Sequence, residues 1–179
     1  GGNATLTLVA DASITLSGIN ITSSTNALNL NLASSQTTNG TVTLTNTTIN
    51  TNGGNLNITA SNSNGTAVSL LGTVNLTLGT GNGTISGASI SNIGLVIDGA
   101  TLNVNVASGS SLNLNGTSST QIGFNLNNSI VALNEKGSLN FNGKTTSSIS
   151  ANYGLKIANT VSIIANQGNV TLTGSASYL

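Results

Sequence analysis

The sequence predicts an all-β protein that folds as a right-handed parallel β-helix, or β-solenoid. Three observations lead to this prediction. Ser111–Ser119 returns in closely similar form as Ser138–Thr146, 27 residues later, and a repeat with such a period is typical of solenoids. Apolar and polar residues alternate over many short stretches, which indicates strands with one buried face. No ten-residue stretch carries the apolar spacing of a helix.

Each coil is expected to begin with a strand in which two apolar residues face inward while the intervening Asn or Thr faces solvent. A weaker member of this first family of strands lies near Ile85. The clear members are Leu6/Leu8, Leu30/Leu32, Leu56/Ile58, Leu112/Leu114, Leu139/Phe141 and Val170/Leu172.

Two more families of apolar residues follow in each period, separated by a small polar turn such as Asp98-Gly99. The spacing predicts about 6–7 coils, with roughly 27 residues and three short strands per coil. The second family comprises Leu16, Leu44, Leu70, Ile97, Leu126 and Ile157. The third family comprises Ile19/Ile21, Ile49, Val74/Leu76, Leu102/Val104, Ile130/Ala132 and Val161/Ile163.

Residues 1–179 are predicted to form a single β-helix segment, because no linker or charge block interrupts the pattern. This segment is expected to be part of a longer repeat-containing chain. The left-handed form of the fold uses hexapeptide units and a shorter coil, so the spacing favours the right-handed form. An isolated coil would be unfolded, because ordering its backbone costs more free energy than its apolar side chains return. Stability must therefore come from stacking. The glycine-rich stretch Gly79–Gly87 is expected to form a bulge or a wide turn.

The composition excludes several classes of partner. Charged residues make up 3% of the chain, against roughly a quarter in ordinary globular domains, and the net charge is zero. Nucleic-acid binding begins with the neutralisation of phosphates, so we expect no nucleic-acid partner. No apolar run approaches the ~20 residues of a membrane-spanning helix, so we expect no membrane insertion.

The sequence offers no set of residues suited to catalysis, to a cofactor or to a metal. Asp11, Asp98 and Glu135 are the only carboxylate side chains, and they fall in different coils, too far apart for an acid–base pair. Both phenylalanines are predicted to face inward, which leaves Tyr153 and Tyr178 as the only aromatic surfaces. We therefore expect a protein that is not an enzyme, with no catalytic residue and no cofactor.

Eleven Asn-x-Ser/Thr sequons are the only candidate modification sites. The abundance of Asn, Ser and Thr makes about nine such sequons expected by chance, so their number is not evidence of glycosylation. The candidate N-glycan acceptors are Asn3, Asn20, Asn39, Asn46, Asn57, Asn64, Asn75, Asn82, Asn115, Asn127 and Asn169.

Three segments, Gly40–Thr45, Gly53–Ala60 and Gly168–Gly174, resemble the repeats of filamentous haemagglutinin and the high-molecular-weight adhesins. These are large exoproteins that Gram-negative bacteria export by two-partner secretion. The resemblance covers essentially the whole chain as a style of repeat, which autotransporter passengers share. The amino-terminal secretion module of the family is not recognisable in this sequence. The resemblance implies a secreted segment of the fibrous shaft of a bacterial surface adhesin.

Two functions from different classes follow. The first is a structural and adhesive shaft that contacts the host-cell surface or extracellular matrix through weak multivalent contacts. The alternative is a self-assembling subunit of an extracellular filament or surface coat, which near-zero charge and open rod ends would favour. Either function implies a location outside the cell or on the bacterial surface.

Overall fold

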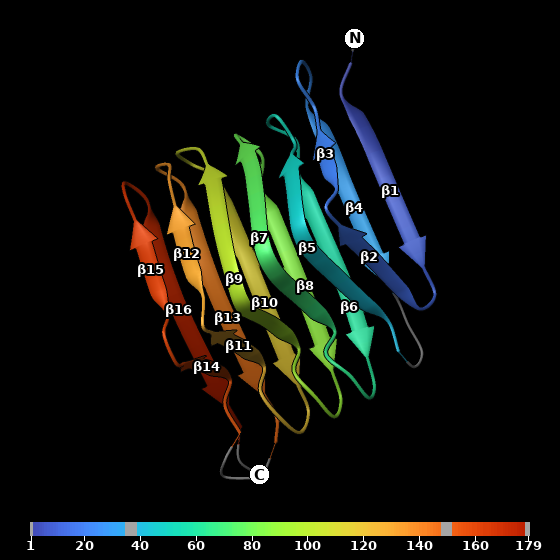
Figure 1. Ribbon diagram of the computed structural model, residues 1–179, viewed down its shortest axis with the longest axis vertical. Helices are drawn as coiled ribbons and strands as arrows, with labels where there is room; N and C mark the ends of the chain where they lie inside the picture. Colours follow the sequence, from blue (N-terminus) through green and yellow to red (C-terminus); the bar gives the residue numbers. More distant parts are fainter. Residues whose placement is uncertain (1, 35–38, 148–151, 178–179) are drawn as a thin grey trace.

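The computed structural model describes residues 2–34, 39–147 and 152–177, and it is a rod of stacked parallel strands. No helix occurs in these three ranges. The chain makes about six turns of about 28 residues each. In Figure 1 it climbs in the front sheet, descends in the rear sheet and advances from right to left, so the coil is right-handed. The predicted right-handed β-helix is confirmed.

The rear sheet of Figure 1 has seven parallel strands and contains the first predicted family of apolar residues. Its register pairs Leu6 with Leu30, and Leu114 with both Ile85 and Phe141. Paired residues are separated by 24 to 31 positions, because turns of different length absorb the variation between coils. In order along the rod, its strands are β1 (Ala4–Ala10), β4 (Leu28–Ser34), β6 (Leu56–Asn62), β8 (Gly83–Ser89), β10 (Ser111–Ser118), β13 (Ser138–Thr145) and β16 (Asn169–Ala176).

The second sheet contains the other two families, whose strands form one bent sheet. The predicted pair of short strands is present in three coils, whereas in β5, β7 and β9 the strand continues through the bend. Its strands are β2 (Ser13–Ser17), β3 (Asn20–Thr22), β5 (Thr41–Asn50), β7 (Val68–Gly79), β9 (Leu95–Val106), β11 (Phe124–Asn127), β12 (Ile130–Leu133), β14 (Leu155–Ala158) and β15 (Ser162–Ala165).

A column of left-handed residues makes this bend. The residue at the bend has a φ between 45° and 66° in every coil, a conformation that glycine adopts freely and asparagine tolerates. All six positions accordingly carry Gly or Asn, which is the small polar turn predicted from the sequence. They are Gly18, Asn46, Gly72, Gly99, Asn128 and Asn159.

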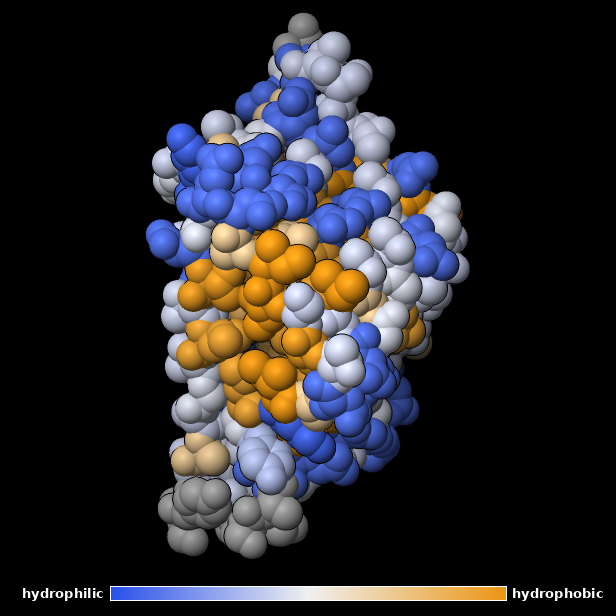
Figure 2. All heavy atoms as spheres, turned by 60° about the vertical axis from the view of Figure 1, so that its left-hand side comes forward, coloured by the Kyte–Doolittle hydropathy of each residue, from blue (hydrophilic) through white to orange (hydrophobic). Residues whose placement is uncertain are grey.

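The core consists of stacked apolar columns between the two sheets. Leu112, Leu114 and Leu139 are fully buried, as the repeat predicted. The two phenylalanines also face inward, with an edge-to-face contact of 5.5 Å between the ring centroids of Phe124 and Phe141. Figure 2 shows that apolar surface gathers at the end of the rod formed by β14, β15 and β16, where no further coil covers these columns.

Two predictions from the sequence need correction. In the third family, Val131 and Leu133 face the core while Ile130 is 48% exposed, so the predicted inward pair Ile130/Ala132 is one residue out of register. Four apolar residues in a row made both registers of this strand plausible. The bulge or wide turn predicted for Gly79–Gly87 is present only in its first part, as a shift of register at Gly79 and a turn at residues 80–82, because residues from Gly83 onward belong to β8.

Glycines close the corner where the chain leaves the first sheet and enters the second. A Cβ atom built on Gly116 would lie 2.1 Å from the carbonyl oxygen of Gly123. A Cβ atom on Gly87 would likewise meet the carbonyl oxygen of Gly94, and one on Gly143 would meet that of Gly154. The two backbones therefore touch in three successive coils, and side chains at these positions would force them apart.

Candidate functional site

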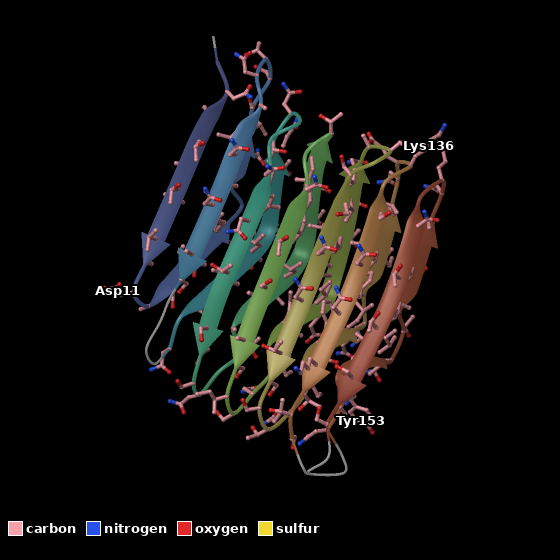
Figure 3. All side chains as sticks on the ribbon, turned by 180° about the vertical axis from the view of Figure 1, so that it is seen from behind. Asp11, Lys136 and Tyr153 are labelled. Carbon is pink, nitrogen blue, oxygen red and sulfur yellow. The ribbon has the colours of Figure 1, made fainter. Side chains whose placement is uncertain are left out.

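The lateral surface of the rod, formed by the outward faces of both sheets, is the largest candidate site. Side-chain amides link the coils along this surface. Figure 3 shows the outward side chains of the first sheet as sticks. The Nδ2 of Asn140 donates to the Oδ1 of Asn113, and that of Asn142 to the Oδ1 of Asn115, both at 2.9 Å. Donors and acceptors that bond each other in this way are less available to a ligand.

All these amide bonds between coils point the same way. On the second sheet, Asn103 donates to Asn75 at 2.8 Å and Asn127 donates to the carboxylate of Asp98 at 2.7 Å. The donor always belongs to the later coil, and the acceptor to the coil before it. The side-chain dipoles therefore give the rod a direction, in addition to that of its strands.

A second ladder, at the start of the first sheet, joins side chains to the backbone. The Oδ1 of Asn29 accepts the backbone N–H of Asn55 at 3.0 Å. In the same way, the Oδ1 of Asn55 accepts the N–H of Asn82, and the Oδ1 of Asn82 accepts the N–H of Ser111, both at 2.9 Å. Each Asn thus satisfies a backbone donor of the next coil, just where that strand begins.

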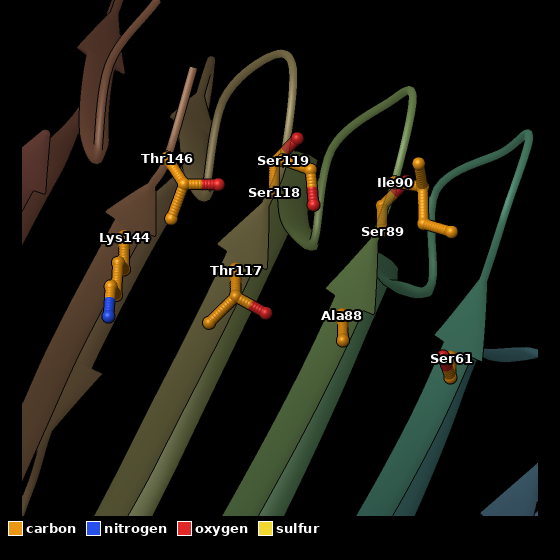
Figure 4. A pocket seen from close by; sticks show the side chains of 9 residues that line it. All are labelled: Ser61, Ala88, Ser89, Ile90, Thr117, Ser118, Ser119, Lys144 and Thr146. Carbon is orange, nitrogen blue, oxygen red and sulfur yellow. The ribbon is translucent and has the colours of Figure 1, made fainter. Parts of the chain in front are cut away.

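A shallow groove runs along the rod at the other end of the first sheet (Figure 4). Its floor is formed by small outward side chains, Ser61, Ala88 and Thr117, and its wall by the turns that follow the strands. Lys144 continues the floor in the next coil and contributes the only charged group among the lining residues. Two overlapping hollows of about 300 and 330 Å³ make up the groove.

Buried hydroxyl groups hold the wall of this groove in place. The Oγ of Ser89 donates to the carbonyl oxygen of Gly65 at 2.9 Å, and the Oγ of Ser118 donates to that of Asn92 at 2.6 Å. Because each serine also accepts a backbone N–H of its own turn, consecutive turns are tied together. The groove is therefore an ordered, open surface that combines exposed hydroxyl groups with apolar side chains, of which Ile90 is the most exposed.

The charged residues do not converge on a reactive centre. Glu135 and Lys136 lie in an exposed turn before β13, while Asp11 lies in the exposed turn after β1. In the described ranges no cluster of three His, Cys, Asp or Glu side chains could hold a metal ion. Within the same ranges, no helix is long and apolar enough to cross a membrane.

The structure separates the eleven sequons by what their amides do. Seven take part in hydrogen bonds, of which four use the Nδ2 atom that would carry a glycan: Asn64, Asn75, Asn115 and Asn127. Another three accept only through Oδ1: Asn39, Asn46 and Asn82. The remaining four residues are exposed, and their side-chain amides bond no group that the structure describes: Asn3, Asn20, Asn57 and Asn169.

Tyr153 is the one tyrosine within the described ranges, and Tyr178 lies outside them. The Tyr153 ring is 50% exposed at a rim of the rod, with the Nζ of Lys156 6.0 Å from its centroid. No sequence pattern indicated the groove, because its floor comes from strands that lie far apart along the chain.

Comparison with models of known families, with curated proteins and with solved structures found no match.

Proposed function

We propose that this chain is a non-enzymatic segment of the shaft of a secreted bacterial surface adhesin, and that it carries weak, repeated contacts along its side. The observation that carries this proposal is the uninterrupted stacking of coils, whose hydrogen-bond ladders and buried columns run the length of the rod. A solenoid of this kind extends by adding coils, without any change to those already present.

The lateral surface supports weak binding more than tight binding. The groove is open and lined mostly by small side chains, with Ile90 and Lys144 among its larger ones, and its described lining includes neither an aromatic residue nor an arginine, the usual anchors of tight interfaces. Many such contacts along a shaft, or on many shafts, would add together to give strong attachment to a host-cell surface or extracellular matrix.

Cell binding by soluble monomer and by the same protein displayed densely on beads tests this function. We expect the monomer to bind host cells with a dissociation constant of about 1 mM or weaker. Bead display should strengthen attachment by about 10²–10⁴-fold. Saturable monomer binding in the nanomolar range would contradict the proposal, as would beads that do not adhere at any density.

A matched pair of variants then locates the contacts. Lys144→Glu reverses the charge in the groove, and Lys136→Glu makes the same change in an exposed turn elsewhere. If the groove contributes to adhesion, only the first variant should alter bead attachment. If both variants adhere like the parent protein, the groove is not the adhesive surface.

A further inference from the structure

The chain contains six Asn–Gly dipeptides, which are chemically labile in flexible peptides. Because glycine has no Cβ atom, its backbone nitrogen can approach the side-chain carbonyl carbon of the preceding asparagine. Ring closure between these two atoms expels the amide nitrogen, so the asparagine deamidates. The six dipeptides are Asn39–Gly40, Asn52–Gly53, Asn64–Gly65, Asn82–Gly83, Asn115–Gly116 and Asn142–Gly143.

Two of these dipeptides lie inside strands, where packing requires both residues. Gly116 and Gly143 are corner glycines whose added Cβ atoms would meet a carbonyl oxygen, while Asn115 and Asn142 belong to the outward amide ladder. Their strands, β10 and β13, are paired on both sides. The glycine nitrogen cannot turn toward the amide carbon unless the strand first leaves its neighbours, which is a costly opening.

Asn82–Gly83 is restrained in a similar way. The Oδ1 of Asn82 accepts the backbone N–H of Ser111 at 2.9 Å, so the next coil holds its amide. Gly83 is a buried residue of β8, which pairs with a strand on each side. A further dipeptide, Asn39–Gly40, borders residues outside the described ranges.

The other two dipeptides, Asn52–Gly53 and Asn64–Gly65, lie in turns, and in both the asparagine is exposed. They differ in what holds the N–H of the glycine. The N–H of Gly53 donates to the backbone carbonyl oxygen of Leu78, in the next coil, at 2.9 Å. The N–H of Gly65 donates to the Oδ1 of Asn62, a side chain of its own turn, at 2.7 Å. Exposure is therefore alike at the two places, whereas the restraint on the attacking nitrogen is not.

The turn that contains Asn64 can open without separating two coils. The Oδ1 of Asn62 accepts the N–H of both Asn64 and Gly65, so movement of one buried carboxamide releases both groups. The Nδ2 of Asn64 donates to the Oδ1 of Asn39 at 3.5 Å, an exposed bond at the limit of hydrogen-bond length. Release of the other turn would instead break a backbone bond between coils.

We propose that Asn64 is the principal site at which this protein deamidates in its folded state. The nitrogen of Gly65 loses its proton to a base from the solvent and attacks the Cγ of Asn64, forming a C–N bond. The Cγ–Nδ2 bond breaks, and the nitrogen takes up one proton and leaves as ammonia. Water then opens the cyclic succinimide at either carbonyl, which yields aspartate or isoaspartate.

The fold can absorb these products at this turn. Isoaspartate lengthens the backbone by one atom, and the turns of this rod already vary in length, since paired residues are separated by 24 to 31 positions. The new carboxylate would lie on the wall of the groove, because the carbonyl oxygen of Gly65 accepts the Oγ of Ser89. Deamidation thus adds negative charge to the rod without unfolding a coil, and it occurs whether or not the rod is adhesive.

Incubation of the folded protein at mildly alkaline pH, followed by peptide mass spectrometry, measures the rate at each asparagine. We expect the rate at Asn64 to exceed that at Asn52 by at least about tenfold, because opening one turn costs less than separating two coils. Asn115 and Asn142 should stay unmodified over the same period. In concentrated urea all these sites should react at similar rates, because the dipeptide is the same.

Asn62→Ala and Asn50→Ala are a matched pair of variants, since each removes an Oδ1 acceptor at the start of one turn. The Oδ1 of Asn62 holds the N–H of Gly65. The Oδ1 of Asn50 accepts the N–H of Asn52 at 3.0 Å, but not that of the following glycine. We expect Asn62→Ala to raise the rate of deamidation in its turn severalfold, and Asn50→Ala to leave the rate in the other turn unchanged.

Gly65→Ala makes the test in the opposite direction if Asn62→Ala does not fold. The added Cβ would lie 3.1 Å from the Nδ2 of Asn62, a side-chain atom that can shift, so this variant should fold. Because the methyl group hinders the attack, the rate at Asn64 should fall while the rate at Asn52 stays the same.

Three results would overturn the proposal. Equal rates at Asn52 and Asn64 in the folded protein would show that exposure alone decides reactivity. A rate at Asn64 no higher than that at Asn115 would show that the turn does not open more easily than a strand. A rate at Asn64 that folded Asn62→Ala leaves unchanged would show that this side chain does not restrain the attacking nitrogen.

Discussion

Replacing Gly116 by alanine tests whether the contact between backbones at the first corner determines stability. The added Cβ would lie 2.1 Å from the carbonyl oxygen of Gly123 and 2.7 Å from its carbonyl carbon, distances that no side-chain rotation can relieve. The overpacking cost in a tight site is about 1–3 kcal/mol, and the backbone contacts place this case toward the upper limit. The lower entropy of the unfolded chain offsets about 0.4–1 kcal/mol of that cost.

We therefore expect Gly116→Ala to lower the free energy of unfolding by about 2 kcal/mol, measured by urea denaturation. An earlier coil carries Ala60 and Ala67 at the equivalent places, so the fold can accommodate methyl groups at this corner in that coil. At Gly116 the neighbouring coils carry Gly87 and Gly143, whose own close contacts oppose any widening of the corner.

Two glycines serve as controls for this measurement. Gly2 has no atom within 4 Å of its added Cβ, so Gly2→Ala should leave stability unchanged. Gly99 also has open space but a φ of +57°, so Gly99→Ala should cost only the left-handed penalty of about 1–2 kcal/mol. A Gly116→Ala protein as stable as the parent would refute the argument from close contact.

Further predictions concern the core, the turns and the sequons. Leu114→Ala should lower the free energy of unfolding by about 2–5 kcal/mol in the same denaturation assay, because Leu114 is fully buried and its removal leaves a cavity. Inserting one glycine between Glu135 and Lys136, in an exposed turn, should leave the circular dichroism spectrum and melting temperature nearly unchanged, whereas the same one-residue insertion after Leu114 should turn the following apolar residues outward and unfold the adjoining coils. Treatment of folded protein with a sequon-specific glycosyltransferase should modify Asn57, whose amide is free of described partners, and leave Asn115 unmodified, as peptide mass spectrometry would show; the reverse order would contradict the hydrogen-bond assignment.

The sequence alone determined the register of the first sheet. Alternation of apolar residues with Asn or Thr permits one inward set per strand, since a slip of one residue would expose Leu112 and Leu114 and bury their polar neighbours. It also predicted a small polar turn between the second and third families, where only Gly and Asn occupy the left-handed position in each coil, but it did not predict that the sheet continues through this bend. Where the alternation failed, at residues 130–133, the predicted register was wrong.

Only the tertiary structure decided which residues meet across coils. Ser61, Ala88 and Thr117 become the floor of one groove because turns of unequal length still bring their strands into the same register. The direction of the amide bonds, the free state of Asn57 and the contact between Gly116 and Gly123 depend likewise on distances between segments. A sequence pattern records which way a side chain points along its own strand; it does not record the position of the next coil, which packing of the whole stack sets.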